Sequence, residues 1–283
     1  MSYDGIQSIR VEVGEGVATA TIDSPPINLL DLPLIASLDA LVRAVEADDD
    51  VRVLVLRSAD PDFFVAHGDL EMIIEMPSDP PPPRREGAND APGLVHPTLE
   101  RFRLMPKVTI AQVEGQARAG GSELTLACDM RFAAIGRAVF GQPEIGLGIL
   151  PAAGGTVRLA RLVGRARASE IILGGEDVSA EEAERLGWVN RALPADELGA
   201  YVDRLARRIA TFSAPAIAGV KAVIAEVERG TPGQLAAEEH AFRVLMAGPE
   251  PRSLMRAALA AGWQTREGEP EIGARLGELG KPV

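Results

Sequence analysis

The chain has 283 residues, 46% of them hydrophobic, which is long enough for one large domain and a smaller appendage around a sizeable core. Its formal net charge of −12 disfavours a general nucleic-acid or anionic-membrane surface, because binding phosphates requires a concentrated basic face. No run approaches about eighteen apolar residues, and residues 1–10 lack a basic cap and an apolar stretch, so we expect no membrane span, no secretion signal and a cytoplasmic location.

The N-terminal third predicts a hairpin, a helix and a buried strand. Residues 8–13 and 17–22 alternate around a turn that contains two glycines, as in a β-hairpin. Apolar residues then recur at helical spacing over 34–45. The nearly continuous β-branched and aliphatic run 51–56 is typical of a strand that helices cover on both faces. This order favours an α/β layer arrangement.

The middle of the chain repeats the sequence of strand, loop and helix. A strand is expected over 108–113, and Gly120-Gly121 opens a helix over 122–128. Another short strand is expected over 130–133, and Gly154-Gly155 introduces a further helix. We expect the core to end near residue 198. The remainder, 199–283, reads as mostly helical and is suited to packing on a partner, with helices expected over 201–212, 214–228, 232–246 and 249–263.

A proline-rich segment, 77–92, interrupts this regularity. It lacks apolar periodicity and contains four consecutive prolines, so we expect an exposed loop. Loops of this length in compact domains are often lids or binding elements, but composition alone indicates simple disorder equally well.

Two turns rich in backbone donors are the first candidate functional features. The turn over 63–70 follows a buried strand and can expose backbone N–H groups. In the turn over 119–123, small residues permit close approach of a ligand, and the start of the helix favours negative charge. Two such turns can supply donors to one oxyanion.

Two carboxylates are candidates for acid–base chemistry, one beside the second turn and one in a constrained loop. Glu123 falls in the first turn of the glycine-opened helix, and Glu144 follows Pro143 in a segment that proline and glycine constrain. Either residue can serve in acid–base catalysis. Glu123 can equally be a favourable partner of the helix dipole, and Glu144 a solvated surface group.

Four landmarks, in this order, resemble the crotonase, or enoyl-CoA hydratase/isomerase, family over nearly the full length of the chain. They are Pro25-Pro26-Ile27-Asn28-Leu29-Leu30 after the first strands, the turn 64–70, Gly120-Gly121-Ser122-Glu123-Leu124 with Cys128-Asp129, and Phe140-Gly141-Gln142-Pro143-Glu144 continuing to Thr156. Each landmark is weak alone, whereas their shared order and spacing are specific.

The resemblance implies an α/β fold, a crotonase-like spiral of ββα units. The core, 1–198, would hold the acyl-CoA site, and the helical region 199–283 would mediate trimerisation, giving a homotrimer or a dimer of trimers. Coenzyme A would be part of the substrate, so we expect no separate cofactor. The single cysteine, Cys128, excludes an internal disulfide and is too few for a cysteine-based metal site, and we expect no metal.

The resemblance also implies site residues and a reaction. The thioester carbonyl would lie between the backbone N–H groups of Gly68 and Gly120, and Glu123 and Glu144 match the two glutamates of the hydratases. Such a site would add water across the 2,3-double bond of an acyl-CoA through an enolate. Further candidates for contacts with the substrate or CoA are Ala66, His67, Asp69, Leu70, Gly121, Pro143 and Ala152.

Other readings of the family resemblance stay open. The same enolate chemistry serves double-bond isomerases, decarboxylases and thioester hydrolases. A non-catalytic relative that binds acyl-CoA or RNA is a third class, although both acids are retained and the net charge is acidic.

Three residues depart from the family pattern or invite a second role. His67 stands where glycine is common, so its imidazole either lies near the thioester or packs away while its backbone lines the pocket. Arg118 can bind a carboxylate or a CoA phosphate, or form an outward-facing structural salt bridge. His96 falls near the place of a catalytic histidine in some relatives, a role we do not expect for it here.

Overall fold

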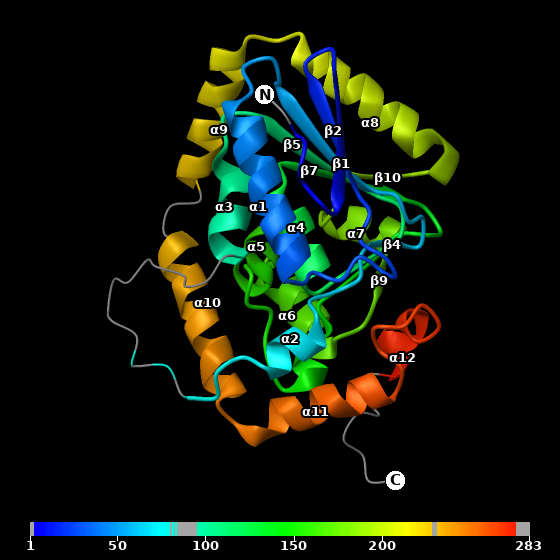
Figure 1. The fold of residues 1–283 in the computed structure, drawn as a ribbon, viewed down its shortest axis with the longest axis vertical. Coiled ribbons are helices and arrows are strands. Elements are labelled where there is room, and N and C mark those ends of the chain that lie inside the picture. Colours follow the sequence, from blue (N-terminus) through cyan, green and yellow to red (C-terminus); the bar gives the residue numbers. More distant parts are fainter. Residues whose placement is uncertain (1–2, 80, 82, 84–94, 228–230, 276–283) are drawn as a thin grey trace.

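The computed structural model describes residues 3–79, 81, 83, 95–227 and 231–275 (Figure 1). Its larger sheet has six strands in the order β1-β2-β3-β5-β7-β10. The pair β1 and β2 is antiparallel, as the predicted hairpin requires, and every later neighbour is parallel. The strands are β1 (Ile9–Gly14), β2 (Val17–Ile22), β3 (Val53–Ser58), β5 (Val108–Val113), β7 (Met130–Ala134) and β10 (Arg191–Leu193).

A second, four-stranded sheet has the order β4-β6-β8-β9, with β8 and β9 antiparallel. Strands β3, β5 and β7 are each followed by one short strand of this sheet and then by a helix. The predicted spiral of ββα units is therefore confirmed. The short strands are β4 (Phe63–Val65), β6 (Gln116–Arg118), β8 (Val139–Gly141) and β9 (Val178–Ser179).

Helices surround the two sheets and follow the periodicity of the sequence. In α1, Asp31 caps the first turn by accepting from the Leu34 amide at 2.8 Å, and the apolar stripe from Leu34 to Val45 is buried. The helices of the core are α1 (Leu32–Ala47), α2 (Leu70–Ile74), α3 (Val95–Leu104), α4 (Gly120–Ala127), the 3₁₀ helix η1 (Pro143–Leu147), α5 (Gly155–Val163), α6 (Arg165–Gly174) and α7 (Ala180–Leu186).

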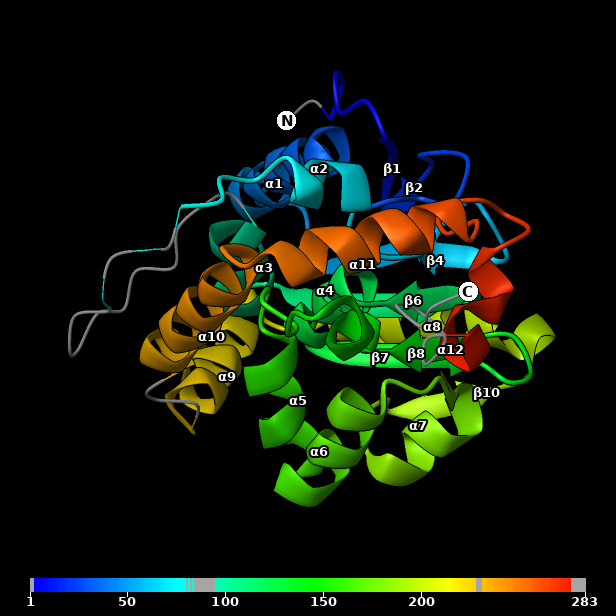
Figure 2. The same cartoon turned by 90° about the horizontal axis from the view of Figure 1, so that it is seen from below.

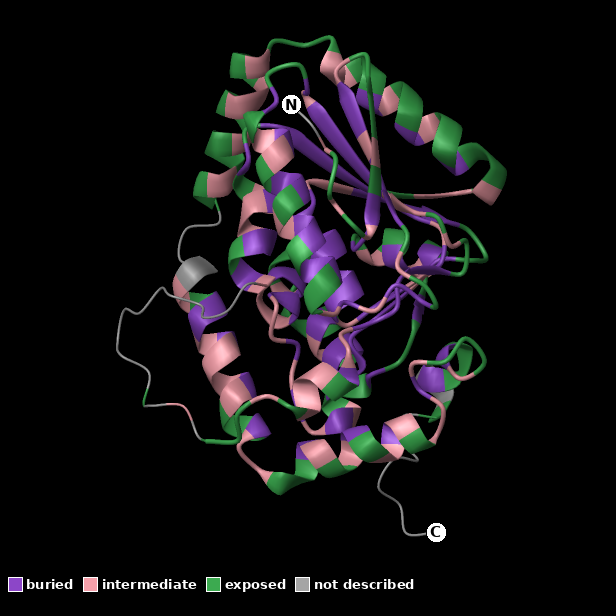
Figure 3. Ribbon diagram, viewed as in Figure 1, coloured by how far each residue is buried: buried purple, intermediate pink, exposed green. Residues whose placement is uncertain are grey.

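Helix α4 lies at the centre of the molecule, and all of its residues are buried (Figure 3). It packs against β4 so closely that a Cβ on Gly121 would lie 1.9 Å from the carbonyl oxygen of Val65. This contact requires glycine at position 121. It also sets the start of α4 beside the turn that follows β4.

The C-terminal region is helical, as predicted. Its elements are α8 (Ala195–Ala210), α9 (Ala214–Val227), α10 (Thr231–Met246), α11 (Pro249–Ala260), the 3₁₀ helix η2 (Glu269–Glu271) and α12 (Ile272–Arg275). Residue 198 falls within α8, which packs its Leu198, Val202 and Ala206 on the larger sheet. The division at 198 stays a prediction.

Helices α10 and α11 return to the core at the end of the molecule opposite the hairpin (Figures 1 and 2). They and the following turn form an apolar cluster with α2 and η1 that contains Leu70, Leu147, Met255 and Trp263. The C-terminal region therefore helps to enclose the space beside α4.

Most of the proline-rich segment 77–92 lies outside the described residues, so the expected loop is untested there. Among the helices that the structure describes, none by itself has the length and hydropathy of a membrane span. Only α8 and α9 taken together meet that measure, and they are bent by 108°.

Candidate active site

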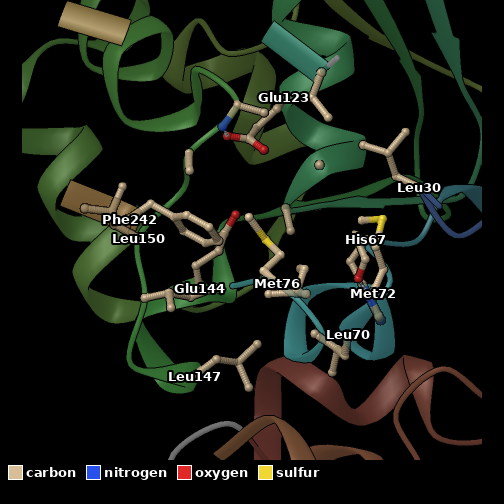
Figure 4. A pocket seen from close by; sticks show the side chains of 18 of the residues that line it. Leu30, His67, Leu70, Met72, Met76, Glu123, Glu144, Leu147, Leu150 and Phe242 are labelled. Atoms are coloured by element: carbon tan, nitrogen blue, oxygen red, sulfur yellow. Dashed lines mark hydrogen bonds between the residues drawn. The ribbon is translucent and has the colours of Figure 1, made fainter. Parts of the chain in front are cut away.

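A cavity of about 230 Å³ lies between the start of α4, the turn before α2, η1 and the C-terminal helices (Figure 4). Its wall is largely aliphatic and aromatic, with a few polar groups that converge on it. Of the residues expected from the sequence, those that line it are His67, Gly68, Leu70, Gly120, Glu123, Pro143, Glu144 and Ala152. Ala66 and Asp69 lie in the adjoining turn and Gly121 lies in the first turn of α4, and none of the three lines the cavity.

The amides of Gly68 and Gly120 lie close together at one side of this cavity. A Cβ on Gly120 would be 3.6 Å from the Gly68 nitrogen. Gly120 is the first residue of α4, where backbone N–H groups have no partner within the helix. Within the described part of the chain, neither amide donates to a protein acceptor. The pair is suited to receiving a partly negative ligand oxygen.

Glu123 is buried in the first turn of α4, and its carboxyl faces the cavity. Its Oε1 accepts hydrogen bonds from the amides of Ala153 at 2.7 Å and Gly155 at 2.8 Å. Burial raises the pKa of Glu123, and these two amides oppose that shift because they favour the ionised form.

Glu144 enters the same cavity from η1, and Figure 4 shows its carboxyl directed toward that of Glu123. Burial and the nearby negative charge of Glu123 raise the pKa of Glu144 well above its ordinary value. With its amide nitrogen turned toward Glu144, Gln142 donates to both carboxyl oxygens, at 3.1 and 3.2 Å. The two glutamates are therefore placed to hold one proton between an acid and a base.

The structure adds two carboxylates that the sequence reasoning missed, both from α10. Glu238 is buried and accepts from the amides of Gly154 at 2.6 Å and Val157 at 2.9 Å. Burial and the charge of Glu123 raise the pKa of Glu238 to about 8.

Glu239 lines the cavity, and its carboxylate lies 3.5 Å from Nε2 of the buried His96. No local signal marks Glu238 and Glu239, since paired glutamates in an alanine-rich helix look like a solvated face.

His67 and Arg118 are both directed toward protein groups. The His67 ring contacts the Gly68 carbonyl at 2.8 Å through Nδ1 and Glu269 at 2.9 Å through Nε2. Arg118 is 1% exposed and donates to both carboxylate oxygens of Asp177 at 2.7 Å. Of the two alternatives for Arg118, the structure contains the salt bridge, but the guanidinium is buried and does not face outward.

Groups that could hold a metal ion, taken as three or more His, Cys, Asp or Glu side chains together, are absent from the part of the chain that the structure describes. The buried carboxyls of the cavity are bound by backbone amides or lie beside one another. Their chemistry is that of proton transfer.

The geometry agrees with comparisons to known proteins. The sequence model of the enoyl-CoA hydratase/isomerase family matches residues 12–255. The short-chain-enoyl-CoA hydratase of Clostridium acetobutylicum is 34% identical over 213 residues, covering 75% of this chain and 78% of that protein. The crotonyl-CoA hydratase of Syntrophomonas wolfei is 34% identical over 210 residues, covering 74% and 76%.

Solved structures give the same result. A crystal structure from Streptomyces avermitilis has a TM-score of 0.85 and 35% identity, covering 96% of this chain and 98% of the other. The enoyl-CoA hydratase from Bacillus halodurans has a TM-score of 0.79 and 26% identity, covering 89% and 100%.

The fold is that of an α/β protein whose largely apolar cavity holds a pair of buried carboxyls. The chain belongs to the enoyl-CoA hydratase/isomerase family. The resemblance inferred from the four sequence landmarks is thus confirmed, and an enoyl-CoA hydratase-like enzyme is the function that this membership supports.

Proposed function

We propose that the protein hydrates the 2,3-double bond of an enoyl-CoA thioester. The observation that carries the proposal is the convergence of two unpartnered amides and two buried glutamates on one largely apolar cavity. The amides suit the thioester oxygen, and the apolar wall suits an acyl chain. Gly68 and Gly120 are then the oxyanion hole, as expected from the sequence.

The different surroundings of the two carboxyls favour separate roles for the glutamates. Glu123 accepts from two amides, which stabilise its carboxylate, whereas the pKa of Glu144 is raised well above its ordinary value, which stabilises its acid form. We assign Glu123 as the base that binds a water molecule and Glu144 as the acid. This ordering follows from their environments.

In the reaction, the water oxygen forms a bond to Cβ while a water proton passes to Glu123. The π electrons of the double bond move onto the thioester oxygen, where the Gly68 and Gly120 amides stabilise the developing enolate. Glu144 then gives its proton to Cα and the carbonyl reforms, yielding a 3-hydroxyacyl-CoA. Net transfer of a proton from Glu123 to Glu144 restores the starting state.

Two substitutions test this assignment. We expect Glu123→Gln and Glu144→Gln each to lower kcat for crotonyl-CoA hydration by about 10²–10⁴-fold, since each removes one proton-transfer group and nearly keeps its shape. The assay follows loss of the conjugated thioester absorbance, with mass spectrometry of the products. Unchanged hydration in both variants would exclude the two-carboxylate mechanism.

A panel of enoyl-, dienoyl- and malonyl-CoA thioesters separates hydration from the other reactions of the family. Formation of a shifted double bond, carbon dioxide or free acid instead of a hydroxyacyl-CoA would replace the proposed reaction. Coenzyme A enters as part of the substrate, and we propose no further cofactor. A cytoplasmic location stays a prediction, and so does a homotrimer or a dimer of trimers, for which α9 supplies an exposed apolar face.

A further inference from the structure

The turn that carries the Gly68 amide is bound by a segment near the C-terminal end of the described chain. Gln264 joins the two regions through its side chain, which donates to Asp69 at 2.8 Å and accepts from the Leu70 amide at 3.2 Å. Glu269 reaches the His67 ring at 2.9 Å across 202 positions of sequence. We call residues 263–269 the C-terminal clasp. It is joined to the turn over residues 67–70 by these three hydrogen bonds.

The hydrogen bonds of His67 fix the orientation of its ring. Nδ1 faces the carbonyl oxygen of Gly68, which can only accept, so Nδ1 carries hydrogen. Nε2 faces Oε1 of Glu269, which already accepts from the Gln264 amide at 2.7 Å. Both ring nitrogens are therefore occupied by protein groups, and these two contacts hold the imidazole in one orientation.

The pair is buried and tightly held. Glu269 is 0% exposed, and its backbone carbonyl accepts from Arg118 at 3.2 Å, while Arg118 is itself paired with Asp177. The second carboxylate oxygen of Glu269 has no hydrogen-bond partner among the described residues.

Gly68 lies between two restrained peptide groups. The His67 carbonyl accepts from the Leu30 amide at 2.8 Å, and the Gly68 carbonyl is held by the His67 ring. Because a trans peptide is planar, fixing the His67 carbonyl directs the Gly68 N–H the opposite way. The next peptide group is held at both ends, since the Asp69 amide donates to the Leu30 carbonyl at 3.3 Å and the His67 ring holds the Gly68 carbonyl. The ring of His67 thus adds a side-chain restraint to the backbone that carries this donor.

We propose that His67 and Glu269 are a positioning pair that holds the Gly68 amide in line with the substrate oxygen. The inference rests on the proposed enolate chemistry, and it assigns the C-terminal clasp to stabilisation of the transition state. Neither side chain transfers a proton. Their contribution appears in kcat, because donors aligned on developing charge act mainly in the transition state.

Kinetics of Glu269→Ala and Glu269→Gln test the pair, with Glu271→Ala as a control on an exposed neighbouring glutamate. We expect Glu269→Ala to lower kcat by about tenfold to a hundredfold with KM within about threefold, as for a misaligned oxyanion donor. Glu269→Gln keeps an acceptor for His67 and should restore most of the loss. Should Glu269→Ala not fold, Glu269→Gln still tests the charge, with a kcat loss of a few-fold expected.

A second measurement separates this inference from the reaction itself. Acetoacetyl-CoA ionises to an enolate with a distinct ultraviolet absorbance, and an aligned oxyanion hole raises the enolate fraction of the bound thioester. We expect that fraction to fall in Glu269→Ala and to return in Glu269→Gln. If the wild-type protein stabilises the enolate but hydrates no enoyl-CoA, the proposed hydration reaction is wrong. The enolate fraction of the Glu269 variants still tests the positioning pair in that case. If both Glu269 variants keep the kcat and the enolate fraction of the wild-type protein, the positioning pair is wrong. It is also wrong if the variants raise KM and leave kcat unchanged.

Discussion

Two glutamates from distant parts of the chain share one short run of backbone amides. Glu123 accepts from Ala153 and Gly155, and Glu238 accepts from Gly154 and Val157. These amides open α5, where the unpaired N–H groups and the helix field favour negative charge. These hydrogen bonds lower the pKa of each carboxyl, but burial raises it by more, so the pKa of both Glu123 and Glu238 lies above its ordinary value.

Glu238 therefore makes stability depend on pH. Its pKa is about 8 in the folded chain and near the ordinary 4.5 when unfolded, so the folded state binds more proton between these values. Its contribution is fully present below the unfolded pKa and is lost as pH rises through 8, with a total of about 5 kcal/mol for a pKa that changes from 4.5 to about 8. Urea unfolding at pH 5 and pH 8.5 should show a smaller fall for Glu238→Gln than for wild type.

The same comparison contains its own control. Glu123 and Glu144 titrate in both proteins, so the difference between the two curves reports Glu238 together with its charge coupling to these two carboxyls. Glutamine loses one of two acceptors, which lowers stability by a similar amount at every pH. Parallel curves would show that Glu238 does not change its protonation on folding.

At the scale of elements, the contact between α4 and β4 places the amide of Gly120 beside the oxyanion turn. Gly121→Ala would drive a Cβ into the Val65 carbonyl, and backbone cannot yield as a flexible side chain can. We expect a loss of at least about 3 kcal/mol in the free energy of unfolding. Gly174→Ala in α6 is the matched control, because no atom lies within 4 Å of its Cβ. Near-wild-type stability of Gly121→Ala in denaturant titrations would contradict the packing argument.

The sequence predicted the elements that carry a local pattern. The hairpin, the buried strands and the glycine-opened α4 all follow from periodicity and turn chemistry, and Glu123 could be placed from its position in that helix. Strands β4, β6 and β8 have three residues each, too few for a period to be visible. Their course became visible only in the structure.

The missed site residues share a different cause. Glu238, Glu239 and Glu269 reach the cavity or its turn through contacts that span many positions of sequence. A hydrogen bond across 202 positions leaves no spacing to detect. The sequence left two places open for the imidazole of His67, and its partner Glu269 could not be named, because residues 269–271 have the composition of an exposed polar segment.

At the scale of the whole molecule, the C-terminal region divides into parts that face inward and one that faces outward. Helices α10 and α11 and the C-terminal clasp close the active site, whereas α9 has no buried residue (Figure 3). A stripe at helical spacing lies open on it, with 61% of Val220, 68% of Val223, 60% of Ile224 and 85% of Val227 exposed. A helix of this length gains most of its stability from packing its apolar face, so α9 needs a cover.

In the homotrimer predicted from the sequence, a second copy of the chain would cover this stripe, and substitution on α9 tests that prediction. We expect Val223→Asp with Val227→Asp to lower the mass in light scattering from three or six chains toward one, because a charge buried in an apolar contact lacks a partner. Leu173→Asp is the control, since Leu173 is 67% exposed on α6, away from this stripe. Acetoacetyl-CoA binding should persist in the dissociated protein, as the clasp that aligns Gly68 comes from the same chain. A wild-type protein that stays monomeric at all concentrations would show that α9 serves another purpose.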